Sequence, residues 1–274
     1  MGRGRIAVFM LFAIASAGVM IALAWIKFER PPAYGDLPAD WFDRPARADP
    51  ASWTLPGAGV LEINGPVRVR IVPEPRADVT VGPAPAGVSV RRVGTVTTIA
   101  AEGPHRCPAA SEGPVVEVRA PLDLIVRTNG PVSADVGPTR TLMLASRGCG
   151  RLVAQGAETA RISTRGAARV ELGRVSRGLD AVVRGPGRLK VAELNGGVDG
   201  EAWGRGTIDI GPGFTGQARF FAKGAGHIYD RGQAGAVIAE ARMMARIRIA
   251  VARGLITGAG DVEVGRPDAP IELF

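Results

Sequence analysis

Residues 184–191 read RGPGRLKV, a glycine–proline corner followed by the apolar, polar, apolar alternation of Leu189, Lys190 and Val191. Glycine permits the positive φ of a tight turn, and alternation with a period of two is typical of a strand with one buried face. This combination of a corner and a short strand recurs along the chain. It therefore decides the fold that the sequence predicts.

The recurrence is nearly regular. The apolar positions that follow successive corners are Val132, Leu152, Val170, Leu189, Ile208, Ile228, Ile247 and Val262, with steps of 20, 18, 19, 19, 20, 19 and 15 residues. Glycine-rich corners precede them, and a second short apolar segment such as residues 181–183 lies between successive positions. A unit of about 19 residues with two or three short strands has the size of one coil of a parallel β-helix, or β-solenoid.

The sequence thus predicts an all-β solenoid with aliphatic side chains stacked in a narrow interior. Residues 240–254 are rich in helix-favouring Ala, Arg and Met, but residues 246–249 alternate as Arg-Ile-Arg-Ile and keep the spacing, so we expect strand there. Residues 55–127 alternate without a clean period. They are either irregular first coils or a β-meander that caps the open end of the solenoid.

The first thirty residues predict export. Arg3 and Arg5 precede 21 uncharged residues, 6–26, which as a helix are long enough to cross a hydrocarbon core of roughly 30 Å. Because most signal peptides have a shorter apolar run, we expect an uncleaved inner-membrane anchor with the C-terminal domain in the periplasm. The alternative is a cleaved signal peptide, which leaves a secreted or periplasmic protein.

Composition sets the domain boundaries. We expect a signal-anchor or transmembrane segment at residues 1–30 and a proline-rich linker at 31–56. The solenoid then spans residues 57–267, and residues 268–274 form a short tail.

Three elements resemble a known family. They are residues 60–69 (VLEINGPVRV), residues 116–122 (VEVRAPL) leading into Thr128-Asn129-Gly130, and residues 258–264 (GAGDVEV). In this order they are similar to the head GIN domain family of bacterial autotransporter adhesins, over roughly residues 53–267. The resemblance implies an exported β-helical domain of unknown function, and it supplies no catalytic residues.

Basic residues recur at the corners of a chain whose net charge is +8. One corner position holds Arg147, Arg165, Arg184, Lys223 and Arg242, with Trp203 at the intervening corner, and a second, incomplete row holds Arg151, Arg169, Arg188 and Arg246. If coils rise by ~4.8 Å each, these cations form a stripe that binds anionic envelope polysaccharide or lipid headgroups. The alternative is that they only solubilise the coil edges.

The sequence predicts no catalytic, cofactor or metal site. The candidate acids are Asp180, Glu193, Asp199, Glu201 and Asp209, which we place at different phases of the repeat. His105 and His227 lie 122 residues apart, which offers no close metal pair. Residues 211–216 match the pattern G-x-G-x-x-G, but no helix is expected after them, so we interpret them as a bend. Nucleic acid is not an expected partner, because no platform of stacking aromatic residues accompanies the basic residues.

Cys107 and Cys149 are separated by 42 residues, about two repeats. In an oxidising compartment a disulfide between neighbouring coils is feasible, and two separate thiols are the alternative. From the whole sequence we expect a non-catalytic, adhesin-like binding or scaffold module of the cell envelope. A β-helical carbohydrate-active enzyme (lyase or hydrolase) and a purely structural spacer are the alternatives.

Overall fold

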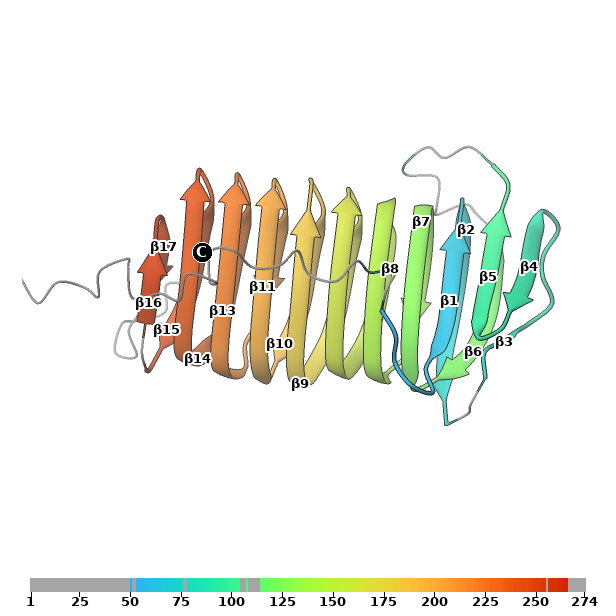
Figure 1. The fold of residues 1–274 in the computed structure, drawn as a ribbon, viewed down its shortest axis with the longest axis horizontal. Coiled ribbons are helices and arrows are strands. Elements are labelled where there is room, and N and C mark those ends of the chain that lie inside the picture. Colours follow the sequence, from blue (N-terminus) through green and yellow to red (C-terminus); the bar gives the residue numbers. More distant parts are fainter. Residues whose placement is uncertain are drawn as a thin grey trace, which may run out of the picture. The chain divides into compact units, whose positions relative to one another are not determined.

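The computed structural model describes residues 50, 53–75, 78–103, 107, 114–254 and 256–265. They form an all-β solenoid, which confirms the predicted fold class for this part of the chain (Figure 1). The predicted anchor at residues 6–26, most of the linker and the tail at 268–274 lie outside the described residues. A search of the described residues found no helix that is long and apolar enough to cross a membrane.

The strands are β1 (Gly59–Asn64), β2 (Val67–Glu74), β3 (Thr80–Val81), β4 (Val88–Val93), β5 (Val96–Ala101), β6 (Val115–Pro121), β7 (Asp123–Val136), β8 (Thr139–Gly166), β9 (Arg169–Arg184), β10 (Arg188–Leu194), β11 (Gly196–Gly204), β12 (Thr207–Ile210), β13 (Phe214–Gly224), β14 (His227–Met243), β15 (Arg246–Ala252), β16 (Ile256–Ala259) and β17 (Val262–Val264).

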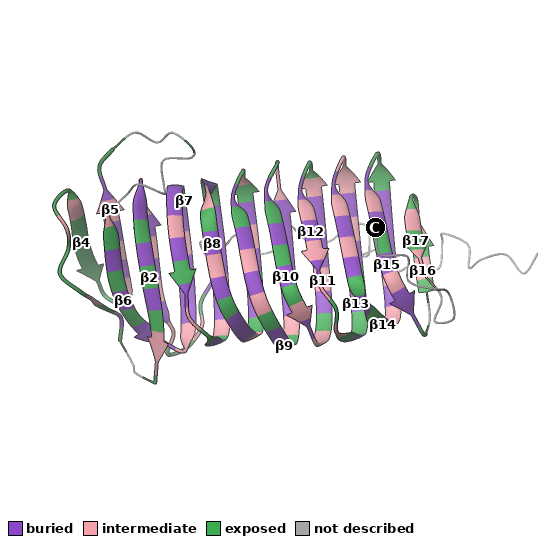
Figure 2. Cartoon of the chain, turned by 180° about the vertical axis from the view of Figure 1, so that it is seen from behind, coloured by how far each residue is buried: buried purple, intermediate pink, exposed green. Residues whose placement is uncertain are grey.

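Each coil contributes to two sheets. The front sheet, which faces the viewer in Figure 1, contains β5, β1, β11, β13 and β16. The rear sheet, which faces the viewer in Figure 2, contains β6, β2, β10, β12, β15 and β17. The long strands β7, β8, β9 and β14 bend at an edge and contribute to both sheets. The pairing between successive coils is parallel.

The interior is a stack of aliphatic columns. One rear-sheet column pairs the predicted positions in register: Leu152 with Val170, then Leu189, Ile208, Ile228, Ile247 and Val262. Burying each such side chain contributes about 1.5–3 kcal/mol, and alternate residues point outward, as the striped strands of Figure 2 show. Six of the predicted steps are therefore confirmed.

The first predicted step is wrong. Leu152 pairs with Ala134, whereas Val132 pairs with Gly150. A Cβ at Gly150 would lie 1.9 Å from the Val132 carbonyl oxygen, so this corner accepts only glycine. A search for apolar residues passes over that glycine and stops at the next inward position, two residues later.

Residues 240–254 are strand, as predicted from their alternation. β14 extends to Met243 and β15 begins at Arg246, with Ile247 and Ile249 buried. The packing of these two isoleucines against the previous coil outweighs the helix preference of the neighbouring Ala, Arg and Met residues.

Residues 55–127 combine the two structures that were left open. The coil made by β1 and β2 lies between the later coil β5–β6 and strand β7, because β1 pairs with β5 and β7, and β2 pairs with β6 and β7. These pairings are parallel, so this coil belongs to the solenoid. β4 and β3 pair antiparallel with β5 and β6 and form the open end.

Candidate functional site

The front sheet turns into the rear sheet at one edge, which we call the basic corner: residues 147–151, 165–169, 184–188, 203–207, 223–227 and 242–246. Each segment except the last turns at a glycine with positive φ, from Gly148 to Gly224. At Gly166, an added Cβ would lie 2.3 Å from the Gly148 carbonyl oxygen of the previous coil. The corner is therefore tight, and the residues on both sides of it are held in register.

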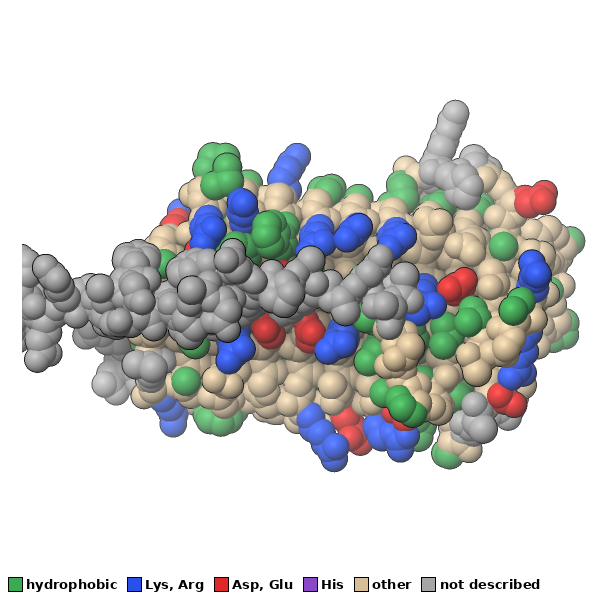
Figure 3. Space-filling view, in the orientation of Figure 1, with side chains coloured by type: hydrophobic (Ala, Val, Ile, Leu, Met, Phe, Trp, Pro, Cys, Tyr) green, Lys and Arg blue, Asp and Glu red, His purple; other side chains and the backbone are tan. Residues whose placement is uncertain are grey.

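The structure stacks the predicted basic residues in two rows along this corner. In the front row Arg165 pairs with Arg184, which is followed by Trp203, Lys223 and Arg242. Arg147 opens this row opposite Asn129. In the rear row Arg151 pairs with Arg169, which is followed by Arg188, Thr207, His227 and Arg246. Neighbouring positions are about 4.8 Å apart. Figure 3 shows Lys and Arg side chains along the upper part of the front face.

Carboxylates neutralise only part of these rows. Arg151 forms an ion pair with Glu171 (3.0 Å), Arg246 with Asp261 (2.8 Å), and Arg242 with Glu240. The hydrogen bond from Arg151 lowers the pKa of Glu171, and Arg169 and Lys190 lower it further by their charge. By contrast, four cations make no ion pair with a described carboxylate: Arg165, Arg184, Arg188 and Lys223. Positive charge therefore remains concentrated in the middle of the basic corner.

Aromatic rings order the front row. Trp203 lies between two cations, with the Arg184 guanidinium carbon 5.8 Å and the Lys223 Nζ 5.5 Å from its ring centroid. Its ring is 5.1 Å from that of Phe221, and its Nε1 donates to the buried carboxylate of Glu201 at 3.2 Å. These contacts fix the ring between the two cations. Phe221 and Glu201 were missed as parts of this site, because only the register of the coils brings them to the corner.

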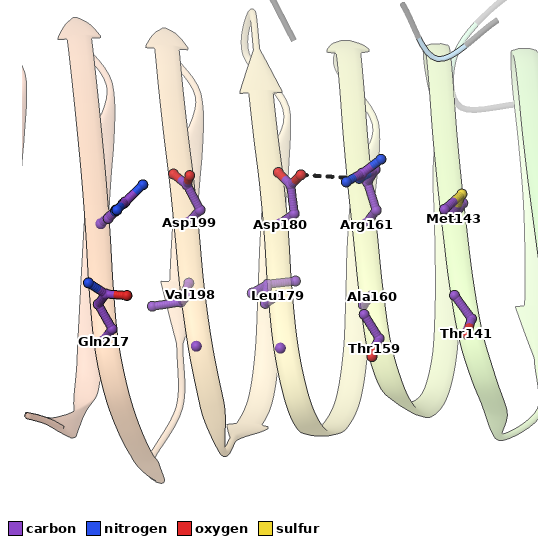
Figure 4. Close-up of a pocket in the computed structure, with 13 residues that line it drawn as sticks. Thr141, Met143, Thr159, Ala160, Arg161, Leu179, Asp180, Val198, Asp199 and Gln217 are labelled. Atoms are coloured by element: carbon purple, nitrogen blue, oxygen red, sulfur yellow. Dashed lines mark hydrogen bonds and ion pairs between the residues drawn. The ribbon is translucent and has the colours of Figure 1, made fainter. Parts of the chain in front are cut away.

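A shallow groove of about 440 Å³ lies on the front sheet, away from the corner (Figure 4). Its floor includes Gly178 and Gly197, and its rim includes Arg161, Asp180 and Asp199. Asp180 pairs in register with Asp199, and Arg161 donates to Asp180 at 3.1 Å. The prediction that these two acids occupy different phases is therefore wrong, since they lie one coil apart on the same column.

The other candidate acids remain dispersed. Glu193 bonds Arg174 on the rear side, and Asp209 bonds Arg231. Among the described residues no group of three or more His, Cys, Asp and Glu side chains is arranged to hold a metal ion. His227 belongs to the rear row of the corner, and His105 lies outside the described residues. Residues 211–216 join β12 to β13, so the G-x-G-x-x-G string is a bend between strands.

Cys107 and Cys149 form a disulfide, with their Cα atoms 6.1 Å apart. Cys107 lies between β5 and β6, and Cys149 lies in the basic corner. At this corner Cys149 pairs with Pro131 of the preceding coil. The bond therefore joins the displaced coil β5–β6 to a coil of the regular solenoid, across the intervening β1–β2 and β7.

Comparisons with known proteins add no family. No family model matches the chain, and no curated protein matches it.

Proposed function

We propose that this chain is a non-catalytic binding or scaffold module of the cell envelope, and that its basic corner binds an anionic component of the envelope. The observation that carries the proposal is the run of cations in register that no described carboxylate neutralises: Arg165, Arg184, Arg188 and Lys223. Scattered solubilising arginines do not need a shared register, whereas a repeated ligand or a charged surface does.

Export to the envelope rests on three further features. Residues 6–26 are long and apolar enough to cross an inner membrane, and Arg3 and Arg5 favour a cytoplasmic N-terminus. The Cys107–Cys149 disulfide fits an oxidising compartment such as the periplasm. The resemblance to the head GIN domain family implies an exported β-helical domain. A secreted form, after cleavage of the N-terminal segment, would present the same corner.

The test is binding of the full chain to purified envelope fractions at low and high salt. We expect salt-sensitive binding that the double reversal Arg165→Glu with Arg184→Glu abolishes. The matched control is Arg70→Glu with Arg91→Glu, which makes the same change in charge at exposed positions away from the corner. Equal loss of binding in both variants, or no binding to any fraction, contradicts the proposal, and the second result leaves a structural spacer.

A carbohydrate-active enzyme is the second candidate, because Asp180 and Asp199 stand one coil apart beside the groove. One coil is ~4.8 Å, close to the separation of about 5–5.5 Å between the two carboxyl groups of retaining glycosidases. Release of sugar from an envelope fraction by the full chain, lost in both Asp180→Asn and Asp199→Asn, would establish this function. No sugar release is the result expected for a binding module.

A further inference from the structure

The last turn of the basic corner differs from the others. At this position the preceding coils have Gly148, Gly166, Gly185, Gly204 and Gly224, all with positive φ, and the last coil has Met243 with a φ of 66°. No other described non-glycine residue has a positive φ. A side chain in this conformation costs roughly 1–2 kcal/mol, which persists only where the surroundings impose it.

The strained turn points two apolar side chains into solvent. Met243 and Met244 are each 78 % exposed, more than any other large hydrophobic side chain in the described part of the chain. They lie between Arg242 at the end of the front row and Arg246 at the end of the rear row, whose side chains are both partly exposed. In Figure 3 a group of hydrophobic side chains projects from the upper edge, next to Lys and Arg side chains. Exposed apolar tips with cations on both sides are typical of surfaces that enter the interface of a bilayer.

The shape of the basic corner favours a flat partner. Small ligands and sugar units are held in concave sites, whereas this corner is the convex edge where two sheets meet. The tips of successive turns are Ala167, Pro186, Arg205, Ala225 and Met244, which lie in line along the edge because the coils are in register. A planar anionic surface contacts all of these tips and both cation rows together.

We propose that the basic corner docks on an anionic phospholipid bilayer, with Met243 and Met244 inserted between the headgroups. This inference rests on the proposed function and names its anionic component. The cations of both rows then lie at the level of the phosphates, where each basic residue near the surface adds to the attraction. Long arginine and lysine side chains reach the headgroups while the methionines enter the apolar boundary. An anchor at residues 6–26 keeps the corner near such a surface.

The experiment uses the full chain in vesicles, so that any contribution of the N-terminal segment is the same in every sample. An environment-sensitive fluorophore is attached at Met244→Cys, and the matched control carries it at Gln155→Cys, an exposed position at the opposite edge. In vesicles with anionic phospholipid we expect a blue shift at position 244 and quenching by lipid-borne quenchers. We expect neither effect at position 155, and neither at position 244 in neutral vesicles.

Two further variants separate the parts of the inference. Arg165→Glu with Arg184→Glu removes the quenching at position 244, and so does high salt. With the label at Ala225→Cys instead, Met243→Gly with Met244→Ser reduces the quenching by at least about twofold, because the inserted apolar area is lost. The glycine also relieves the strained φ, so that loss cannot come from unfolding of the turn.

The two proposals fail differently. A label at position 244 that remains in water on anionic vesicles, or that is quenched no more than the label at position 155, overturns the bilayer inference. If the chain nevertheless binds an envelope polysaccharide and loses this binding with Arg165→Glu and Arg184→Glu, the proposed function stands with a different ligand. Loss of both results overturns both.

Discussion

A single carboxyl group interrupts an aliphatic column of the core. Asp230 occupies an inward position between Ile210 of the preceding coil and Ile249 of the next, and it is 2 % exposed. Its Oδ1 accepts a hydrogen bond from the Gly232 N–H at 3.0 Å. Its Oδ2 has no hydrogen-bond partner among the described residues. Burial raises the pKa of Asp230 from 3.8 to about 6, although the Gly232 hydrogen bond opposes this change.

This raised pKa makes stability fall as the pH increases. The folded chain binds the Asp230 proton more tightly than the unfolded chain, so the protonated carboxyl is compatible with the fold below pH ~4. Between pH 4 and 7 the folded protein must pay for a buried charge that the unfolded chain carries in water. The difference between a pKa of 3.8 and one of about 6 corresponds to about 3 kcal/mol, at about 1.4 kcal/mol per pKa unit.

Asp230→Asn removes the charge and keeps the shape and the acceptor for the Gly232 N–H. We expect the variant to unfold in urea with a free energy about 3 kcal/mol higher than the parent at pH 8, and with nearly the same free energy at pH 4. Asp135→Asn, at an exposed position, is the control and should change little at either pH. An Asp230→Asn variant that gains nothing at pH 8, or that gains equally at both pH values, refutes the reasoning.

Two further predictions concern the disulfide and the corner glycines. Cys149→Ser, like reduction of the parent, should lower the free energy of unfolding by about 4 kcal/mol, because the bond closes a loop of 42 residues; a urea midpoint that does not respond to a reductant contradicts this. Gly166→Ala should destabilise by about 2 kcal/mol or more, since its φ is 110° and its Cβ would meet a backbone oxygen at 2.3 Å. Gly216→Ala is the matched control, because no described atom lies within 4 Å of its Cβ, and equal melting temperatures of the two variants would show that the corner is not tight.

Local pattern predicted most of the solenoid, because each coil repeats the same requirement. An inward aliphatic residue and a turn are needed once per coil, so their spacing reveals both the coil length and the position of the rear-sheet column. The same pattern did not predict the order of the first coils. The alternation of residues 67–71 suits any place in a parallel sheet, and only pairing with β6 and β7 puts β2 between them. That choice depends on contacts between distant residues, which local alternation does not encode.

Phase along the chain is harder to predict than coil length, as the acids of the groove show. Asp180 and Asp199 are paired across a step of 19 residues, but the next residue of that column, Arg219, is 20 residues further on. The register between β11 and β13 shifts between Gly196 and Val198, so the extra residue is taken up at the bend from the rear to the front sheet. A count that starts from rear-sheet positions therefore loses the front-sheet phase at each such irregularity. The basic corner escaped this error because its front and rear rows lie next to each other, on the side of each coil where glycines mark the turn.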